Sequence, residues 1–117
     1  MNPAPVKPEI SFDTFASIDV RVGTIDSVND VPGSAKLLRL DVDFGDHRRV
    51  ILAGMKKERE NPQGLVGIQA LFVVNLPPRR MAGEVSEGML FDIGYSDGIL
   101  PVLAVPERRV PDGSRAG

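Results

Sequence analysis

The 117-residue chain is long enough to form one domain with a single hydrophobic core and too short to form two. Its net charge of −2 excludes a protein that coats nucleic acid through bulk positive charge, so nucleic-acid binding would require a local basic patch. The absence of cysteine excludes disulfides, thiol catalysis and thiolate metal sites; since no apolar run could cross a bilayer, we expect a cytoplasmic protein.

The N-terminal residues predict a tail followed by a short helical turn. Residues 1–10 carry several prolines and no apolar stretch of the kind found in signal peptides, so we expect a flexible, proline-rich tail. Ser11 can cap a helical turn that places Phe12 and Phe15 on one face. We therefore expect the globular domain to cover residues 11–113 and residues 114–117 to form a second tail.

The first predicted strand follows this turn. Ile18, Val20 and Val22 alternate with polar or small residues, which indicates a half-buried strand. The apolar phase shifts to Ile25 after Gly23. A glycine at such a shift predicts a bulge or a sharp bend in the strand.

A hairpin is predicted next. Residues 38–44 show the cleanest apolar–polar alternation in the chain, and Gly45-Asp46-His47 turns them into a partner strand at Arg49–Ala53. Residues 56–64 are polar and contain Asn61-Pro62-Gln63-Gly64, which stops any helix that begins there. We expect an irregular connection at this point.

Three further apolar runs complete the predicted strands. Ile68–Val74 is β-branched and flanked by glycine and proline, Met89–Ile93 follows a glycine, and Ile99–Val105 contains Pro101, which favours an edge or interface position. The pattern predicts an all-β domain, a five-stranded barrel of the oligonucleotide-binding (OB) kind with a short N-terminal helical turn and a C-terminal extension. A small sandwich is the alternative on pattern alone.

Cations follow two of the predicted turns. Arg79 and Arg80 come directly after Pro77-Pro78, and their planar guanidinium groups suit paired hydrogen bonds to phosphate. Lys36 follows a Pro-Gly turn in the same manner. The alternative for all three is a solvated surface charge with no specific partner.

Three uncharged side chains have two interpretations each. Asn75 leaves a buried strand and could read a ribose or base edge, or could tie down the proline turn through backbone bonds. Ser86 and Met89 could contact a ligand in the same region. Met89 could equally fill the core.

Aromatic stacking is not favoured by the sequence. Phe44, Phe72 and Phe91 fall on apolar strand phases, so we expect them in the core, and only Tyr95 is free to stack on a base. We therefore expect RNA to be recognised through its backbone and its shape.

Catalytic and metal chemistry are also not indicated. Asp41, Asp43, Asp46 and His47 could gather around a cation, but acidic residues on the wet face of a strand are the usual case. With one histidine and no cysteine, the common nucleophile–base pairs cannot be built, and no phosphate-cradling glycine loop is present. We expect no enzyme, no cofactor and no metal ion.

Five motifs in order resemble one known family. They are residues 18–25 (IDVRVGTI), 34–37 (SAKL), 49–54 (RVILAG), Asn75-Leu76 with Pro78-Arg79 and Met81, and Ser86-Glu87-Gly88-Met89. This set is similar to the small stand-alone tRNA-binding domains of the OB-fold superfamily. That superfamily includes the CsaA secretion chaperones and the domains appended to methionyl- and phenylalanyl-tRNA synthetases.

The resemblance implies a binding site and a dimer. Relatives contact the folded outer corner of tRNA at positions that correspond here to Lys36, Arg49, Asn75, Arg79, Ser86 and Met89, to which we add Arg80. Small members are homodimers joined outside the barrel, here through residues 11–16 and 99–110. The implied interface residues are Phe12, Phe15, Ile99, Leu100, Val102 and Leu103.

Two functions follow as expectations. The first is structure-specific tRNA binding by a homodimer. The second is a CsaA-like chaperone that holds unfolded or export-bound polypeptides, since Pro77-Pro78 resembles that branch whereas Arg49–Met55 follows the tRNA-binding pattern. A subunit that acts with an aminoacyl-tRNA synthetase is a third possibility.

Overall fold

The computed structural model describes residues 2–117, and Met1, the first residue of the expected tail, lies outside the described residues. The chain forms α1 (Phe12–Ala16), β1 (Val20–Asp30), β2 (Leu38–Asp43), β3 (Arg48–Ala53), the 3-10 turns η1 (Lys56–Glu58) and η2 (Pro62–Leu65), β4 (Gln69–Val73), β5 (Arg79–Met81), β6 (Glu84–Ser86), β7 (Met89–Leu90), β8 (Asp92–Ile93), the 3-10 turn η3 (Tyr95–Asp97), β9 (Val102–Leu103) and β10 (Arg115–Ala116). In this part of the chain no helix is long and apolar enough to span a membrane.

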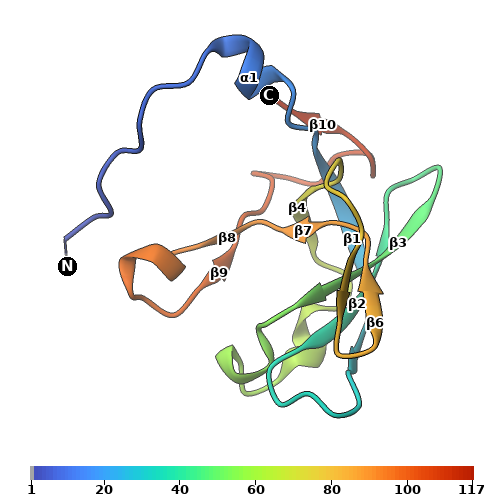
Figure 1. Ribbon diagram of the computed structural model, residues 1–117. Helices are drawn as coiled ribbons and strands as arrows, with labels where there is room; N and C mark the ends of the chain where they lie inside the picture. The colour runs from blue at the N-terminus through green and yellow to red at the C-terminus, as the bar shows by residue number, and fades with distance from the viewer. Residues whose placement is uncertain (1) are drawn as a thin grey trace.

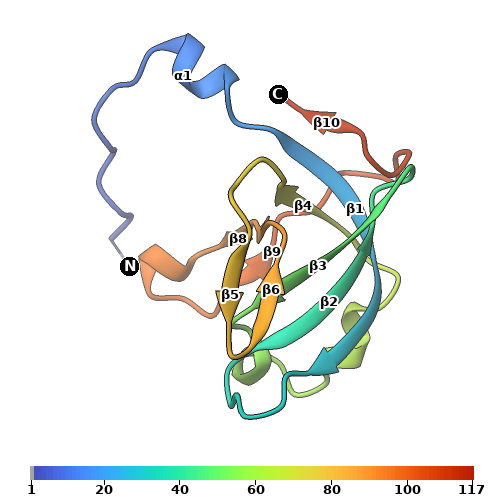
Figure 2. The same ribbon diagram turned by 45° about the vertical axis from the view of Figure 1, so that its right-hand side comes forward.

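One curled antiparallel sheet organises the molecule, with strand order β3-β2-β1-β4-β7 and β10 added beside β1 (Figure 1). The all-β, OB-like architecture is therefore confirmed, as are the β2–β3 hairpin and the irregular connection between β3 and β4. Figure 2 shows β1, β2 and β3 sweeping together across the body, with the β5–β6 hairpin lying in front of them.

The strand β1 is long because it serves both halves of the sheet, pairing with β4 near its start and with β2 near its end. Its bulge lies between Ile25 and Ser27 rather than at Gly23, where a bend was expected. Gly23 has another purpose: a Cβ there would stand 2.5 Å from Val42 Cγ1 and 2.8 Å from the Phe44 ring. The glycine lets β1 pass close to the buried face of β2.

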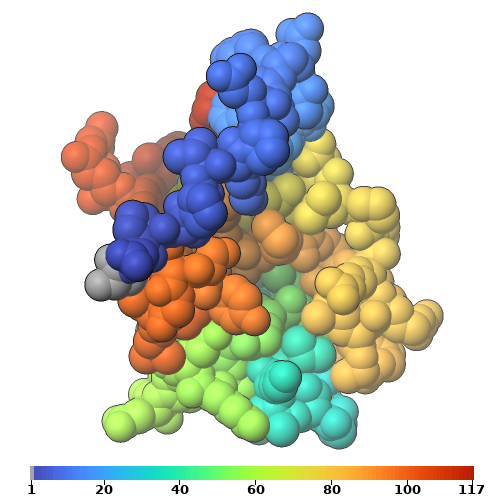
Figure 3. Space-filling view, turned by 60° about the vertical axis from the view of Figure 1, so that its left-hand side comes forward, coloured from blue at the N-terminus to red at the C-terminus, as the bar shows by residue number. Residues whose placement is uncertain are grey.

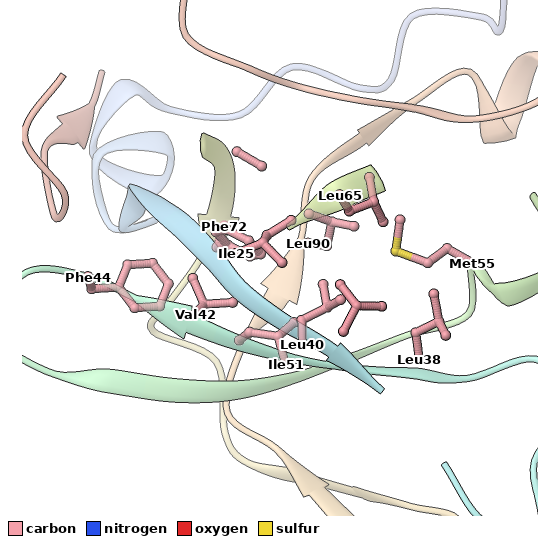
Figure 4. Packing of buried hydrophobic residues seen from close by; sticks show 12 residues of the cluster. Ile25, Leu38, Leu40, Val42, Phe44, Ile51, Met55, Leu65, Phe72 and Leu90 are labelled. Carbon is pink, nitrogen blue, oxygen red and sulfur yellow. The ribbon is translucent and has the colours of Figure 1, made fainter. Parts of the chain in front are cut away.

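The core lies inside the curl of the sheet (Figure 4). Residues of β2 alternate between buried and half-buried, as their sequence pattern predicts. Phe44 and Phe72 meet edge to face with ring centroids 5.5 Å apart. The buried cluster comprises Ile25, Val28, Leu38, Leu40, Val42, Phe44, Ile51, Met55, Leu65, Ala70, Phe72 and Leu90.

The barrel closes between β3 and the segment that links β6 to β7. Glu87 N donates to Val50 O at 2.8 Å, and its carboxylate accepts from Val50 N at 2.9 Å. Gly88 leaves no space for a side chain, because a Cβ would stand 2.9 Å from Val73 O and 2.8 Å from Ile51 Cδ1. The Ser86-Glu87-Gly88-Met89 motif therefore completes the fold.

The expected fifth and sixth strands are shorter than predicted. Met89–Ile93 is divided into β7 and β8 at Phe91, whose N–H donates to Leu71 O at 2.9 Å while its carbonyl accepts from Ala104 N at 3.2 Å. Ile99–Val105 yields only β9, which pairs with β8, because Pro101 has no N–H to donate.

The C-terminus differs from the expected tail. Residues 114–117 contain β10, which pairs with the first residues of β1. The segment before it is held by Gln69, whose amide donates to Val110 O at 2.6 Å and accepts from Val110 N at 3.0 Å. Thr24 adds a 2.6 Å bond to Asp112 Oδ1. This strap covers the end of the barrel beside Phe44.

The N-terminal segment stays outside the barrel. Ser11 caps α1 as expected, its Oγ accepting from Thr14 N at 3.0 Å, but no residue of the helix is buried. Residues 2–10 are exposed and form no helix or strand (Figure 1). One bond ties them to the body, from Ala4 N to Asp97 Oδ1 at 2.6 Å.

Candidate nucleic-acid interface

A groove of about 740 Å³ opens where the ends of several strands meet. Figure 3 looks onto this face and shows a hollow between residues 91–100, residues 76–90 and the segment that follows β3. The lining consists of Lys36, residues 52–55, Glu58, Leu76, Pro77, Arg79, Met81, Ser86, residues 88–92, Tyr95 and Ser96. Four of the seven predicted RNA-binding residues, Lys36, Arg79, Ser86 and Met89, are therefore brought together.

Lys36 is presented to the groove by a fixed turn. Ser34 Oγ accepts from Leu37 N at 3.0 Å, and the Lys36 carbonyl accepts from Lys56 N at 3.0 Å. The side chain is exposed, and within residues 2–117 no carboxylate forms an ion pair with it. A cation held this way is available to an anionic partner.

Arg79 and Arg80 lie on a hairpin that the sequence did not predict. β5 and β6 pair around a turn in which Ala82 and Gly83 both have positive φ, the geometry that two-residue hairpin turns need. Because successive strand residues face opposite sides, Arg79 lines the groove and Arg80 is exposed outside it. Both guanidinium groups lack an ion pair within the described part of the chain.

The hairpin is anchored on the outside of the sheet. Arg39 Nη1 on β2 lies 3.2 Å from Glu84 Oε1 on β6. Met81 packs against a second apolar cluster of Val31, Leu37 and Leu52. Glu84 is therefore part of an ordered support for Arg79.

Arg49 stands apart from the groove, and two of its three guanidinium nitrogens form hydrogen bonds within the protein. Nη1 donates to Val74 O at 2.7 Å and to Glu87 O at 2.9 Å, and Nε lies 3.0 Å from His47 Nε2. These bonds join β3 to the exits of β4 and β6. The geometry favours a structural function for Arg49 over a free phosphate contact.

Asn75 ties two segments together, although not the proline turn that its position suggested. Its Oδ1 accepts from Asp19 N at 2.8 Å and its Nδ2 donates to Ser17 O at 2.7 Å. Both polar atoms are therefore engaged with the chain before β1. The residue lies outside the groove lining.

Ser86 and Met89 have opposite surroundings. Ser86 is only 3% exposed, and its Oγ accepts from Leu52 N at 2.9 Å and donates to Gly88 O at 3.0 Å. Met89 is 46% exposed and faces the groove, so it does not fill the core. Of this pair, Met89 is the one available to a ligand.

Two aromatic residues extend the groove beyond what the sequence predicted. Phe91, expected in the core, is 41% exposed and lines the groove, and Tyr95 beside it is 77% exposed. The signal was present in the alternation: Leu90 is buried, so its neighbour Phe91 must face the other way. The prediction that Phe91 packs in the core was wrong for this reason.

The groove also carries acidic groups. Burial raises the pKa of Glu58, and the nearby charge of Asp92 raises it further, while Arg59 opposes the shift. Arg59 Nη1 lies 3.6 Å from Glu58 Oε1. Cations and carboxylates in the same lining give the groove a mixed electrostatic character.

The acidic residues near the β2–β3 turn form hydrogen bonds with other groups of the protein. Asp41 Oδ2 accepts from Ser27 Oγ at 2.7 Å, Asp43 Oδ1 accepts from Gly45 N at 2.8 Å, and His47 Nδ1 lies 2.6 Å from Asp46 Oδ1. Within residues 2–117, no group of three His, Asp or Glu side chains is arranged to hold a metal ion.

Comparisons with known proteins identify the family. Residues 20–115 match the family described as "Putative tRNA binding domain". The chain belongs to this family. Over 110 residues it is 41% identical to the methionine–tRNA ligase of Bacteroides fragilis, covering 94% of this chain and 16% of that enzyme.

Solved structures agree with this assignment. The MetRS-related protein from Pyrococcus horikoshii superposes with a TM-score of 0.86 at 32% identity, covering 95% of this chain and 100% of that one. The chaperone CsaA from Bacillus anthracis superposes with a TM-score of 0.79 at 31% identity, covering 94% and 100%. The resemblance drawn from the five motifs is thus confirmed for the methionyl-tRNA synthetase and CsaA relatives.

Proposed function

We propose that this domain binds folded tRNA through its phosphate backbone, as a homodimer in the cytoplasm. The observation that carries the proposal is that Lys36 and Arg79, from distant parts of the chain, line one groove without internal ion pairs. Membership of the tRNA-binding family supplies the class of ligand. Because the net charge of the protein is negative, we expect RNA to be attracted only to this cationic face.

The arrangement suits recognition of shape rather than sequence. Arg79 offers a planar fork of donors that matches phosphate oxygens, and Lys36 offers a point charge on the same groove. Arg80 on the other face of the hairpin extends the charged surface. Phosphate contacts position a nucleic acid without reading its bases.

Retention of tRNA tests the proposal. At low salt, purified protein should shift total tRNA in a gel-mobility assay and should release it as salt rises. A duplex DNA of equal length is the control, since its backbone geometry differs, and should be retained more weakly. Absence of any tRNA shift at low salt would end the proposal.

The dimer is supported by apolar residues left exposed outside the barrel. Phe12 and Phe15 on α1, Ile99 and Val102 are exposed, and Leu100 is 66% exposed. Leu103 differs from the other predicted interface residues, because it is half-buried and packs against the core of its own barrel. We propose that the five exposed residues meet their counterparts in a second copy.

Sedimentation of a charged variant tests this dimer. Leu100→Asp would bury an unpaired carboxylate in the interface, which costs about 3 kcal/mol, so the dimer should dissociate at least a hundredfold more readily. Val6→Asp adds the same charge on the exposed N-terminal segment and should leave the mass unchanged. A monomeric native protein, or a Leu100→Asp variant that stays dimeric, would contradict the interface.

A CsaA-like chaperone is the second candidate. The likeness to the Bacillus anthracis chaperone and the exposed apolar residues favour it. Such a function would be seen as suppressed aggregation of a denatured substrate that excess tRNA does not relieve. If the aggregation rate is unchanged by the protein, this candidate is removed.

A further inference from the structure

The aromatic side of the groove has no function in phosphate binding. Tyr95 stands on η3, a turn closed by Gly98 N donating to Tyr95 O at 3.2 Å and Ile99 N donating to Gly94 O at 3.2 Å. Gly94 and Gly98 both have positive φ, and Ile99 packs where a Cβ on Gly94 would stand. The ring is therefore exposed on a fixed support and does not lie on a free loop.

Phe91 and Met89 lie along the same groove as Tyr95. Both are exposed although both are apolar, and both come from the segment that runs along the closing edge of the barrel. Aromatic rings and a polarizable thioether are the surfaces on which nucleobases stack. Exposed rings facing a groove with cations at its rim fit a base and its phosphates.

The same groove carries hydrogen-bond acceptors that no phosphate could use. Glu58 and Asp92 line it, and Glu58 Oε1 is buried without a hydrogen bond, with Arg59 Nη1 at 3.6 Å as its ion-pair partner. Ionised carboxylates accept hydrogen bonds and donate none. They repel phosphate and carbonyl oxygens, so they select a ligand edge that offers an amino group.

We infer that the groove holds one unstacked base of the bound RNA, stacked on Tyr95 and Phe91, with an exocyclic amino group directed to Glu58 and Asp92. The inference rests on the proposed function and adds to it a preference for a base that carries an exocyclic amino group. Lys36 and Arg79 at the rim lie where the phosphates on either side of such a base could pass. A volume of about 740 Å³ is ample for one nucleotide.

A comparison of cytosine with uracil tests the amino-group contact separately from the stacking. The two bases have the same ring size, but cytosine carries an amino group where uracil carries a carbonyl oxygen. Glutamate accepts readily from that amino group. An eight-residue oligocytidine should therefore bind more tightly than oligouridine, by about fivefold or more, which is the scale of one such discrimination.

The protein carries its own reporter for stacking. Tyr95 is the single tyrosine and there is no tryptophan, so the emission of the protein comes from the groove. Oligocytidine should quench this emission in a saturable manner, and free N-acetyltyrosinamide at equal absorbance gives the correction for light absorbed by the RNA. Unquenched emission while a labelled oligocytidine is shown to bind by anisotropy would overturn the stacking.

Variants complete the test. Tyr95→Ala should weaken oligocytidine binding about tenfold, and Tyr95→Phe should restore it to within about twofold. Glu58→Gln should reduce the preference for cytosine, because the glutamine amide can also donate to the uracil carbonyl, whereas Glu60→Gln, exposed outside the groove, should keep it. Equal affinity of the native protein for both oligonucleotides would overturn the selection. If tRNA binds normally in that case, the proposed function stands without this inference; if tRNA does not bind, both fall.

Discussion

Replacing Lys36 and Arg79 together with alanine should weaken tRNA binding by about 2 kcal/mol, or roughly thirtyfold, without changing the melting temperature. Both side chains are exposed, line the groove and form no ion pair within residues 2–117, so their loss removes ligand contacts but no contact that supports the fold. Gel-mobility titration of total tRNA and thermal unfolding measure the two effects.

A matched variant separates local contacts from overall charge. Lys57→Ala with Arg108→Ala removes two exposed cations that lie outside the groove, so its net charge equals that of the first variant. We expect its tRNA affinity to change by less than about threefold, because single exposed charges away from a ligand contribute little. Equal losses in the two double variants would mean that tRNA responds to total charge and not to the groove.

Ser86→Ala should lower the stability of the fold by about 2 kcal/mol, which corresponds to a fall in melting temperature of about 8 °C. The substitution leaves the Leu52 N–H without its acceptor at a buried strand edge. Differential scanning calorimetry measures the fall. Ser96→Ala, at an exposed position on the same groove, should leave the melting temperature unchanged.

The tRNA affinity of the folded Ser86→Ala variant shows whether the Ser86 hydroxyl supports the fold or contacts tRNA. Measured well below its melting temperature, this affinity should stay within about twofold of the native value, because the Oγ is occupied by Leu52 and Gly88. A variant with native stability and lost tRNA binding would show instead that Ser86 contacts the ligand.

The strands that the sequence predicted well are those with a clear local pattern. β2 alternates over its whole length, and a glycine turn joins it to β3, so the hairpin follows from neighbours in the chain. The C-terminal strap and β10 depend on Gln69 and Thr24, which bond to residues about forty and ninety positions away. No local pattern encodes such contacts, so residues 114–117 read as a tail.

The candidate site shows a similar division. Turn chemistry singled out Lys36 and Arg79 as candidate phosphate contacts, and both line the groove; the family motifs pointed to Arg49, Asn75 and Ser86 as well. Each of these last three side chains forms hydrogen bonds to backbone groups of its own barrel. A motif alone cannot distinguish a residue that holds the barrel closed from one that touches a ligand, because both need a polar side chain at a strand end.

The salt dependence of tRNA binding tests the central claim most directly. If Lys36, Arg79 and Arg80 neutralise about three phosphates, log K should fall with log salt at a slope of roughly −2 to −3. In the Lys36→Ala, Arg79→Ala variant the slope should shrink to roughly −1, since about one phosphate contact remains. An unchanged slope in this variant would contradict the claim that these two groove residues hold the tRNA backbone.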